Sequence, residues 1–227
     1  MKKQFSIIFV IVLLCSVSQI YAKYKADDTF TESKPFILLD FDDKSEANNV
    51  SGQFGTFDAN PRDKEAYIRK RFKKDKDLHK NGYHLYLKYD VDSSQAAFNG
   101  IWTKLNGLDL SGFQAFTITV MGDKSLGFSD FFKIELKTKK DKIESTVEDI
   151  SDKWQKLVIP FSEFEGDLEE FDMTDMYEFT IVFEDWKFKE KTGAYYIDDI
   201  GFITKKGATL KFSDLLGGKK KKPKTEK

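Results

Sequence analysis

Apolar and polar residues alternate with a period of two through much of this chain. Residues 83–91 (YHLYLKYDV) change character at nearly every step, and residues 132–137 (FKIELK) and 177–184 (YEFTIVFE) show the same pattern. Successive side chains of a β-strand point to opposite faces, so alternation predicts strands with one buried and one polar face. We expect these segments to be half-buried strands.

Residues 98–123 predict two further strands joined by a glycine-containing connection at 106–112. In the first strand, Ile101 and Leu105 are expected to face the core together with Thr103, while Trp102 and Lys104 face the other way. In the second strand the expected core row consists of Phe116, Ile118 and Val120.

The remaining apolar runs complete an all-β pattern. Strands are expected at 35–41, 66–72, 154–160 and 193–203, with loop or a short strand at 48–61 and a helical turn at 161–164. About eight short strands at regular spacing, without a long amphipathic helix, predict a jelly-roll β-sandwich.

The predicted domain organisation has four parts. Residues 1–22 form a signal peptide, 23–35 a polar leader, 36–204 the sandwich and 205–227 a lysine-rich tail. The tail has one small apolar cluster before its lysines, which predicts disorder because little apolar surface can be buried.

The N-terminus carries the pattern of a secretory signal. Lys2 and Lys3 precede a nearly uncharged apolar run at 5–17, and a small residue, Ala22, is the expected cleavage point. The apolar run is shorter than the roughly 20 residues that a spanning helix needs. The predicted destination is therefore periplasmic or extracellular.

The single cysteine, Cys15, lies inside this segment. Leu14 occupies the position at which a lipoprotein signal has a small residue, so the pattern favours cleavage over lipidation. Cleavage removes the only thiol, and the mature chain is expected to have no disulfide.

Charge narrows the choice of partners. The chain has 37 basic and 38 acidic residues; without Lys2, Lys3 and the last nine residues the count is 29 against 37, a formal charge of −8 for residues 23–218. An acidic body argues against nucleic acid as a partner. Two basic runs, 69–74 and 219–222, have the composition to meet anionic polysaccharide or lipid headgroups. We interpret the first run as a solvated face. For the second run, in the tail, the choice between a solvated segment and a binding segment stays open.

Aromatic residues on faces turned away from the core are candidates for a sugar platform, because aromatic rings complement the C–H faces of sugars. Trp102, Tyr86 and Phe98 are the expected rings, and Trp186 is expected to rim a groove. Three neighbours of Tyr86 on its face offer hydrogen bonds to hydroxyl groups, namely His84, Lys88 and Asp90. The alternative is that a loop or the other sheet covers these rings.

Catalytic patterns are weak. The two histidines, His79 and His84, do not form a metal-binding pair, and adjacent carboxylates such as Glu169 and Glu170 are expected by chance among 38 acidic residues. The sequence predicts a protein that is not an enzyme.

Four motifs in order resemble the galactose-binding-domain-like β-sandwiches, and most closely the family-eleven carbohydrate-binding modules. They are LDFD at 39–42, GIW at 100–102 with DLSGF at 109–113, the segment 154–161, and YIDDI at 196–200. The resemblance spans about residues 36–203. It implies a jelly-roll fold, a structural calcium ion, binding of β-glucans in a shallow groove, and a core position for Trp154.

The chain departs from that family at positions that bear on specificity. Phe98 and Phe183 stand where the family has groove tyrosines, and residues 165–167 (EGD) stand where it carries basic residues. A phenylalanine lacks the hydroxyl that fixes a sugar's orientation, so the resemblance does not carry the family's glucan specificity to this chain.

The calcium implied by the resemblance would lie where the first and last strands meet. That arrangement brings Asp42 and Asp198 together, with Asp40, Asp43 and Asp199 nearby; carboxylates are ligands that calcium prefers. The alternative is that these aspartates only cap strand ends.

The sequence thus predicts an exported, monomeric, non-catalytic module that binds a polysaccharide or glycan. The alternative is a protein-binding assembly or adhesion module of the same fold, because the complex I intermediate-associated proteins share the strand pattern around residues 154–164.

Overall fold

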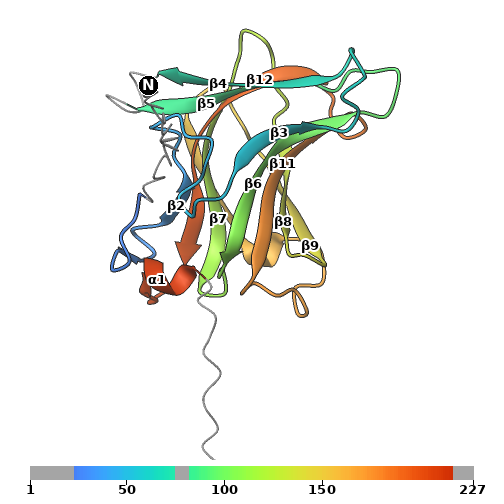
Figure 1. The fold of residues 1–227 in the computed structure, drawn as a ribbon. Coiled ribbons are helices and arrows are strands. Elements are labelled where there is room, and N and C mark those ends of the chain that lie inside the picture. The colour runs from blue at the N-terminus through green and yellow to red at the C-terminus, as the bar shows by residue number, and fades with distance from the viewer. Residues whose placement is uncertain (1–22, 75–81, 217–227) are drawn as a thin grey trace, which may run out of the picture.

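The computed structural model describes residues 23–74 and 82–216 as two antiparallel sheets packed face to face (Figure 1). The predicted signal peptide, His79 and the lysine run 219–222 lie outside these residues. In the part of the chain that is described, no helix has the length and apolar character needed to cross a membrane. The predicted all-β sandwich is confirmed.

The first sheet contains six strands, and β12 is its longest member. Along the sheet the order is β10 (Gln155–Pro160), β7 (Phe113–Gly122), β12 (Thr192–Thr204), β5 (Tyr83–Asp90) and β4 (Tyr67–Lys74). The sixth strand, β2 (Phe36–Leu39), pairs with the second half of β12. The sheet therefore changes neighbours partway along β12, from β5 to β2.

The second sheet contains five strands. Their order is β3 (Phe54–Asp58), β6 (Phe98–Leu108), β11 (Met176–Glu184), β8 (Phe132–Lys137) and β9 (Lys142–Val147). The strand β9 was not predicted, because its residues, KIESTV, carry few apolar side chains. The predicted helical turn is the 3₁₀ helix η1 (Phe161–Glu163), which follows Pro160 directly.

The core lies between the sheets and follows the predicted rows. Ile101, Thr103 and Leu105 are buried, as are the three core residues expected in β7. Rings from both sheets stack at one end: Phe183 of β11 lies 4.6 Å from Tyr89 and 5.6 Å from Tyr195, nearly parallel to both. Aromatic stacking adds specific geometry to the burial of large apolar area.

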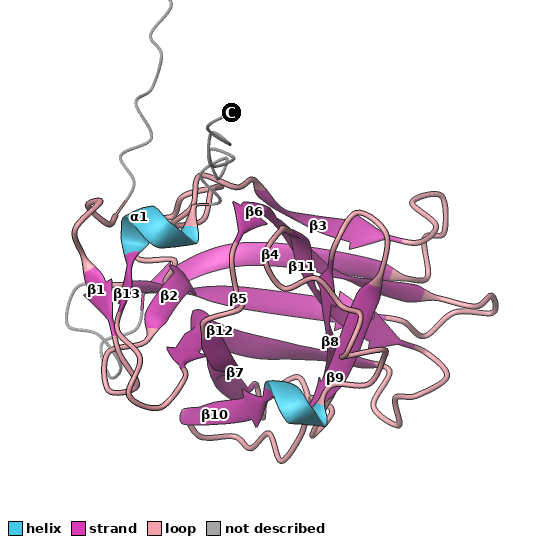
Figure 2. Ribbon diagram, turned by 90° about the horizontal axis from the view of Figure 1, so that it is seen from below, coloured by secondary structure: helices cyan, strands magenta, loops and turns pink. Residues whose placement is uncertain are grey.

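The two ends of the described chain form a clasp against one end of the sandwich, which corrects the predicted loose leader and the predicted disorder of residues 205–216. The strand β1 (Thr29–Phe30) pairs with β13 (Leu210–Lys211), and the helix α1 (Phe212–Leu215) follows. Figure 2 shows the three elements together. The ring of Phe212 packs near Tyr24, Phe30 and Phe36. Phe212 and Leu215 of the small apolar cluster are buried, because the leader supplies the matching half of their core.

Candidate functional site

The outer face of the five-stranded sheet carries three rows of side chains set by strand register. The central row crosses the sheet through Trp102, Thr180, Glu135 and Glu144. The rows on either side are Lys104–Glu178–Lys137–Lys142 and Gly100–Val182–Lys133–Thr146. Aromatic side chains therefore gather over β3 and β6, and charged side chains over β11, β8 and β9.

Two glycines create room for the aromatic rings. A Cβ atom on Gly55 would lie 2.9 Å from the Trp102 ring, and one on Gly100 would lie 2.9 Å from the ring of Phe57. Both rings consequently lie close over backbone that has no side chain of its own. The Trp102 indole N–H also donates to the carbonyl of Thr56 at 3.3 Å, which fixes the orientation of its ring.

The aromatic group continues to the end of β6 and beyond β11. Phe98 lies 6.4 Å from Phe57 and 6.2 Å from Trp186, measured between ring centroids. Phe98 is 40% exposed and Trp186 is 59% exposed. Exposed large rings in contact with one another are uncommon on a soluble protein and mark a candidate binding surface.

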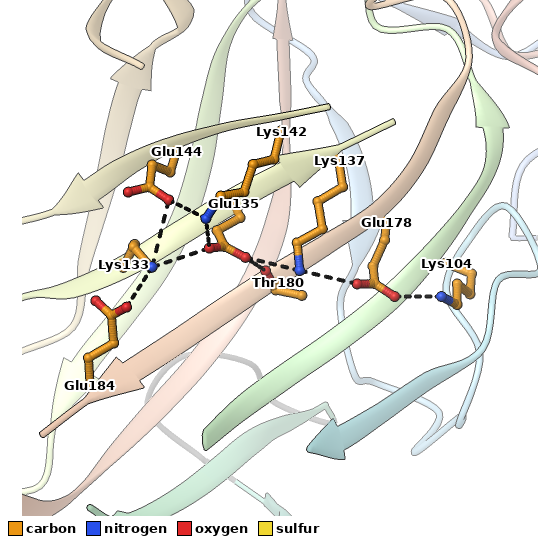
Figure 3. A network of polar contacts seen from close by, with 9 residues as sticks. All are labelled: Lys104, Lys133, Glu135, Lys137, Lys142, Glu144, Glu178, Thr180 and Glu184. Atoms are coloured by element: carbon orange, nitrogen blue, oxygen red, sulfur yellow. Dashed lines mark hydrogen bonds and ion pairs between the residues drawn. The ribbon is translucent and has the colours of Figure 1, made fainter. Parts of the chain in front are cut away.

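A continuous network of ion pairs covers the rest of this face (Figure 3). Glu178 pairs with Lys104 at 2.5 Å and with Lys137 at 3.3 Å. Glu135 pairs with Lys137 and Lys142 at 3.0 and 2.7 Å. The network continues through Lys133, which lies 3.2 Å from Glu135 and also pairs with Glu144 and Glu184. Glu184 in turn pairs with Lys187 at 3.5 Å.

Glu135 is the centre of this network. Burial by itself raises the pKa of its carboxyl group, but hydrogen bonds from Lys142 and Lys137 and the nearby lysine charges outweigh burial, so the pKa lies well below its usual range. The hydroxyl of Thr180 also donates to it at 3.0 Å. Glu135 is therefore ionised at neutral pH, and each of the four glutamates of the network has at least one lysine partner.

A shallow groove of about 380 Å³ lies where the aromatic group meets the network. It is lined by Phe57, Phe98, Trp102, Lys104, Lys137, Glu178 and Thr180. One wall supplies ring faces, and the floor supplies ammonium donors and a carboxylate acceptor. This is the combination that binds a ring with polar substituents, because the apolar face and the hydroxyl groups are satisfied separately.

A second hollow of about 250 Å³ lies at the other end of the same face. Its lining is polar and includes Glu144, Glu163 and Glu165 together with Lys133 and Lys187. No aromatic ring lines this hollow, so it offers no surface for stacking.

The structure divides the predicted platform residues between the two sheets. Phe98 and Trp102 line the groove, and Trp186 lies beside Phe98 at its rim. Tyr86, His84 and Asp90 belong to β5 of the other sheet, so the expectation of a single platform is wrong. Alternation placed each side chain outward, but it gave no information on which sheet the strand joins.

The β5 residues have a different environment from the groove. His84 is buried, with its ring 5.4 Å from Trp154 and 5.3 Å from Tyr196. Tyr86 donates its hydroxyl hydrogen to Asp123 at 3.0 Å. Trp154 is half-buried in this group outside the core, so the expected core position of Trp154 is wrong.

The predicted calcium ligands, Asp42 and Asp198, lie near the point on β12 where its pairing partner changes from β5 to β2. Burial, followed by repulsion from Asp199, Asp42 and Asp40, raises the pKa of Asp198 to about 8. Phe41 and Asp199 have φ angles of 56° and 43°, in the left-handed region that non-glycine residues rarely adopt.

Electrostatic repulsion among these carboxylates fits a cation, but the ligand set is incomplete. Within residues 23–74 and 82–216, no three His, Cys, Asp or Glu side chains converge as ligands of a metal ion. Further ligands would have to be backbone carbonyls, which calcium accepts.

Several groove residues were missed by sequence reasoning. Phe57 lies in a segment expected to be loop or a short strand, and Lys137, Glu178 and Thr180 were recognised only as the polar partners of alternating strands. The available signal was the recurrence of lysine and glutamate on the polar positions of 132–137 and 177–184. This recurrence showed that the side chains lie on an outer face, but it did not show which strands lie next to each other.

Comparison with known proteins identifies the fold. No protein-family model matches the chain, and no curated protein sequence matches it significantly. Among solved structures, the family 11 carbohydrate-binding module of the cellulosomal cellulase Lic26A-Cel5E of Clostridium thermocellum has a TM-score of 0.56 at 14% identity. The similarity covers 77% of this chain and 96% of that module.

Two other solved structures are similar. The Clostridium thermocellum family 11 module in complex with a β-1,3-1,4-mixed-linked tetrasaccharide has a TM-score of 0.51 at 15% identity over 67% of this chain and 89% of that one. An exo-β-agarase has a TM-score of 0.54 at 10% identity, over 75% of this chain and 25% of the agarase. The chain therefore has the β-sandwich fold of the family 11 carbohydrate-binding modules.

Proposed function

We propose that this chain is an exported, non-catalytic module that binds a polysaccharide or glycan in the groove beside Trp102. The observation that carries the proposal is the juxtaposition of three aromatic rings with paired lysine and glutamate side chains in one groove of about 380 Å³. Support also comes from the similar solved structures, which include a carbohydrate-binding module bound to a tetrasaccharide.

The groove residues have distinct roles in this proposal. The indole of Trp102, oriented by its bond to Thr56, stacks on the face of a sugar ring. The Lys104 ammonium group donates to hydroxyl oxygens, and the Glu178 carboxylate accepts from hydroxyl hydrogens. Because each charge keeps a partner of opposite sign, the floor holds its geometry without the ligand, and little side-chain entropy is lost on binding.

The test is a glycan screen followed by titration of the best ligand, starting with mixed-linked β-glucan in affinity electrophoresis. Trp102→Ala is expected to weaken binding about tenfold or more, equivalent to about 1.4 kcal/mol. Leu126→Ala, which removes an exposed apolar side chain outside the groove, serves as the control. Unchanged binding in Trp102→Ala, with a melting temperature like that of the unsubstituted chain, would exclude the groove as the site.

The same surface has the composition of a protein-binding site, because exposed rings such as those of Phe98 and Trp186 are enriched at protein interfaces. The screen separates the two functions. No glycan bound by the chain, together with a partner protein lost on Trp102→Ala, would favour the assembly or adhesion function over carbohydrate binding.

We also propose that calcium binds where Asp42 and Asp198 approach each other. A cation there would relieve the repulsion that raises the pKa of Asp198. Calcium is expected to raise the melting temperature by several degrees relative to chelator, because a ligand of the folded state stabilises it. Asp198→Asn should abolish that shift, whereas Asp141→Asn, at an exposed turn, should retain it. Identical melting curves with calcium and with chelator would remove the ion from the proposal.

Export is proposed from the pattern of residues 1–22. N-terminal sequencing of the secreted chain is expected to begin at Lys23. A mature protein that still begins at Met1 would contradict cleavage.

A further inference from the structure

The outer face of the six-stranded sheet carries a row of cations at its edge. The edge strand β4 pairs with β5, and its outward side chains are those of Tyr67, Arg69, Arg71 and Lys73. Arg71 stands directly opposite Tyr86, and Arg69 stands opposite Lys88. Alternate residues of a strand are about 6.7 Å apart, so Arg69, Arg71 and Lys73 form a straight row of positive charges.

The row has a fourth cation beside it, Lys88 of β5. Among the residues that the structure describes, no carboxylate forms an ion pair with Arg69, Arg71, Lys73 or Lys88. On the other sheet, by contrast, each of the four network lysines has a carboxylate partner. The sequence-based interpretation of the basic run as a merely solvated face does not account for this contrast, since the body carries an excess of acidic residues.

Two carboxylates on this face, those of Asp123 and Asp90, already accept hydrogen bonds. Asp123 accepts hydrogen bonds from Tyr86 and Tyr196 on one oxygen and from Ser125 on the other. Asp90 accepts from the backbone N–H of Asp92.

Tyrosine rings hold two of the cations in place. The Lys73 ammonium group lies 3.2 Å from the centroid of the Tyr86 ring, and the Arg69 guanidinium lies 4.7 Å from that of Tyr67. Cation–π contacts of this kind restrict the long side chains before any partner arrives, which reduces the entropy lost on binding.

We propose that this cationic row, Arg69, Arg71, Lys73 and Lys88, binds a linear anionic polysaccharide through its carboxylate or sulfate groups. Charge complementarity carries the proposal: evenly spaced, pre-positioned cations with no carboxylate partner among the described residues match a chain with a repeating negative charge. The row lies on the sheet opposite the groove beside Trp102, so it is a second site, independent of the proposed groove function.

Two other polyanions fit less well. Insertion into a membrane surface needs exposed apolar side chains beside the cations, and none of the exposed large apolar residues in the described ranges lies on β4 or β5. Single-stranded nucleic acid stacks its bases on open aromatic faces, whereas the rings of Tyr67 and Tyr86 are capped by cations.

The test uses the full mature chain and sodium polygalacturonate in affinity electrophoresis, with neutral dextran for comparison. Binding to polygalacturonate is expected, and it should weaken between about 50 and about 200 mM salt because the contacts are ionic. Arg69→Gln/Arg71→Gln is expected to weaken it about tenfold or more. The matched control is Lys205→Gln/Lys206→Gln. It removes two exposed cations that have no ion pair within the described ranges, and it should bind like the unsubstituted chain.

The lysine run of the tail needs a separate variant. Replacing Lys219 to Lys222 by glutamine should leave most of the polygalacturonate binding in place; binding that depends on the tail and not on Arg69 and Arg71 would overturn the proposal. Phosphatidylserine vesicles and single-stranded DNA are measured in parallel. Capture of either in preference to polygalacturonate would overturn the assignment to polysaccharide.

Discussion

Trp102 shows how far a single side chain can be understood from its neighbours in the sequence. Alternation with Ile101 and Thr103 placed its ring on an outer face, and the structure agrees. The bond from its indole N–H to Thr56, and the absence of a side chain at Gly55, depend on a strand some 46 residues away in sequence. The outward placement of the ring was predictable, whereas its fixed orientation was not.

Glu135 gives a pH prediction at the same scale. Its pKa in the folded protein is depressed below the ordinary value of 4.5. The stability that its ionised form contributes is therefore fully present above about pH 4.5 and is lost as the pH falls through the depressed pKa. Urea unfolding from pH 7 to pH 2.5 should show a steep acid loss in the unsubstituted chain and a shallower one in Glu135→Gln.

At neutral pH, Glu135→Gln should cost about 1–3 kcal/mol, because it leaves partly buried ammonium groups with fewer acceptors. Glu148→Gln is the control, since Glu148 is exposed and has no ion pair within the described ranges. Parallel pH profiles for the unsubstituted chain and Glu135→Gln would show that the network does not depend on this carboxylate.

At the scale of elements, the alternation of apolar and polar residues predicted the main strands but did not predict the clasp. The bounds of β5, β8 and β11 lie within two residues of the predicted segments. The clasp was missed because β1 has two residues and α1 has four, too few for a periodic pattern. Such short elements are stable only when they are packed against each other and the sandwich.

Phe212→Ala tests whether the clasp stabilises the fold. The ring is 3% exposed and touches rings from the N-terminal segment and from β2. Its removal should cost about 3–5 kcal/mol of the free energy of unfolding, as for other large buried side chains. Lys211→Ala, at the neighbouring exposed position, should change stability little. A Phe212→Ala melting temperature equal to that of Lys211→Ala would mean that the clasp is not part of the cooperative unit.

At the scale of the whole molecule, the two outer faces have different chemistry. One presents a groove with rings over ion-paired side chains, and the other presents the cationic row. Sheets of a sandwich face away from each other, so one ligand cannot span both faces without passing around an edge.

The two faces are therefore expected to act independently. Arg69→Gln/Arg71→Gln should retain the affinity for the neutral glycan, and Trp102→Ala should retain the affinity for polygalacturonate. Binding of each ligand is measured with the other present at saturation, which should leave the first affinity unchanged. A change of more than about threefold in either direction would indicate that the sites are coupled or shared.

The sequence by itself determined the class of fold and the facing of most side chains, because alternation is local and a strand turns successive residues to opposite sides. The tertiary structure decided which strands are neighbours. Tyr86 and Trp102 carry the same local signal, yet the packing assigns β5 to one sheet and β6 to the other. Pairings such as Glu178 with Lys104, or Arg71 with Tyr86, are set by register between strands, and register is fixed when the whole core is buried.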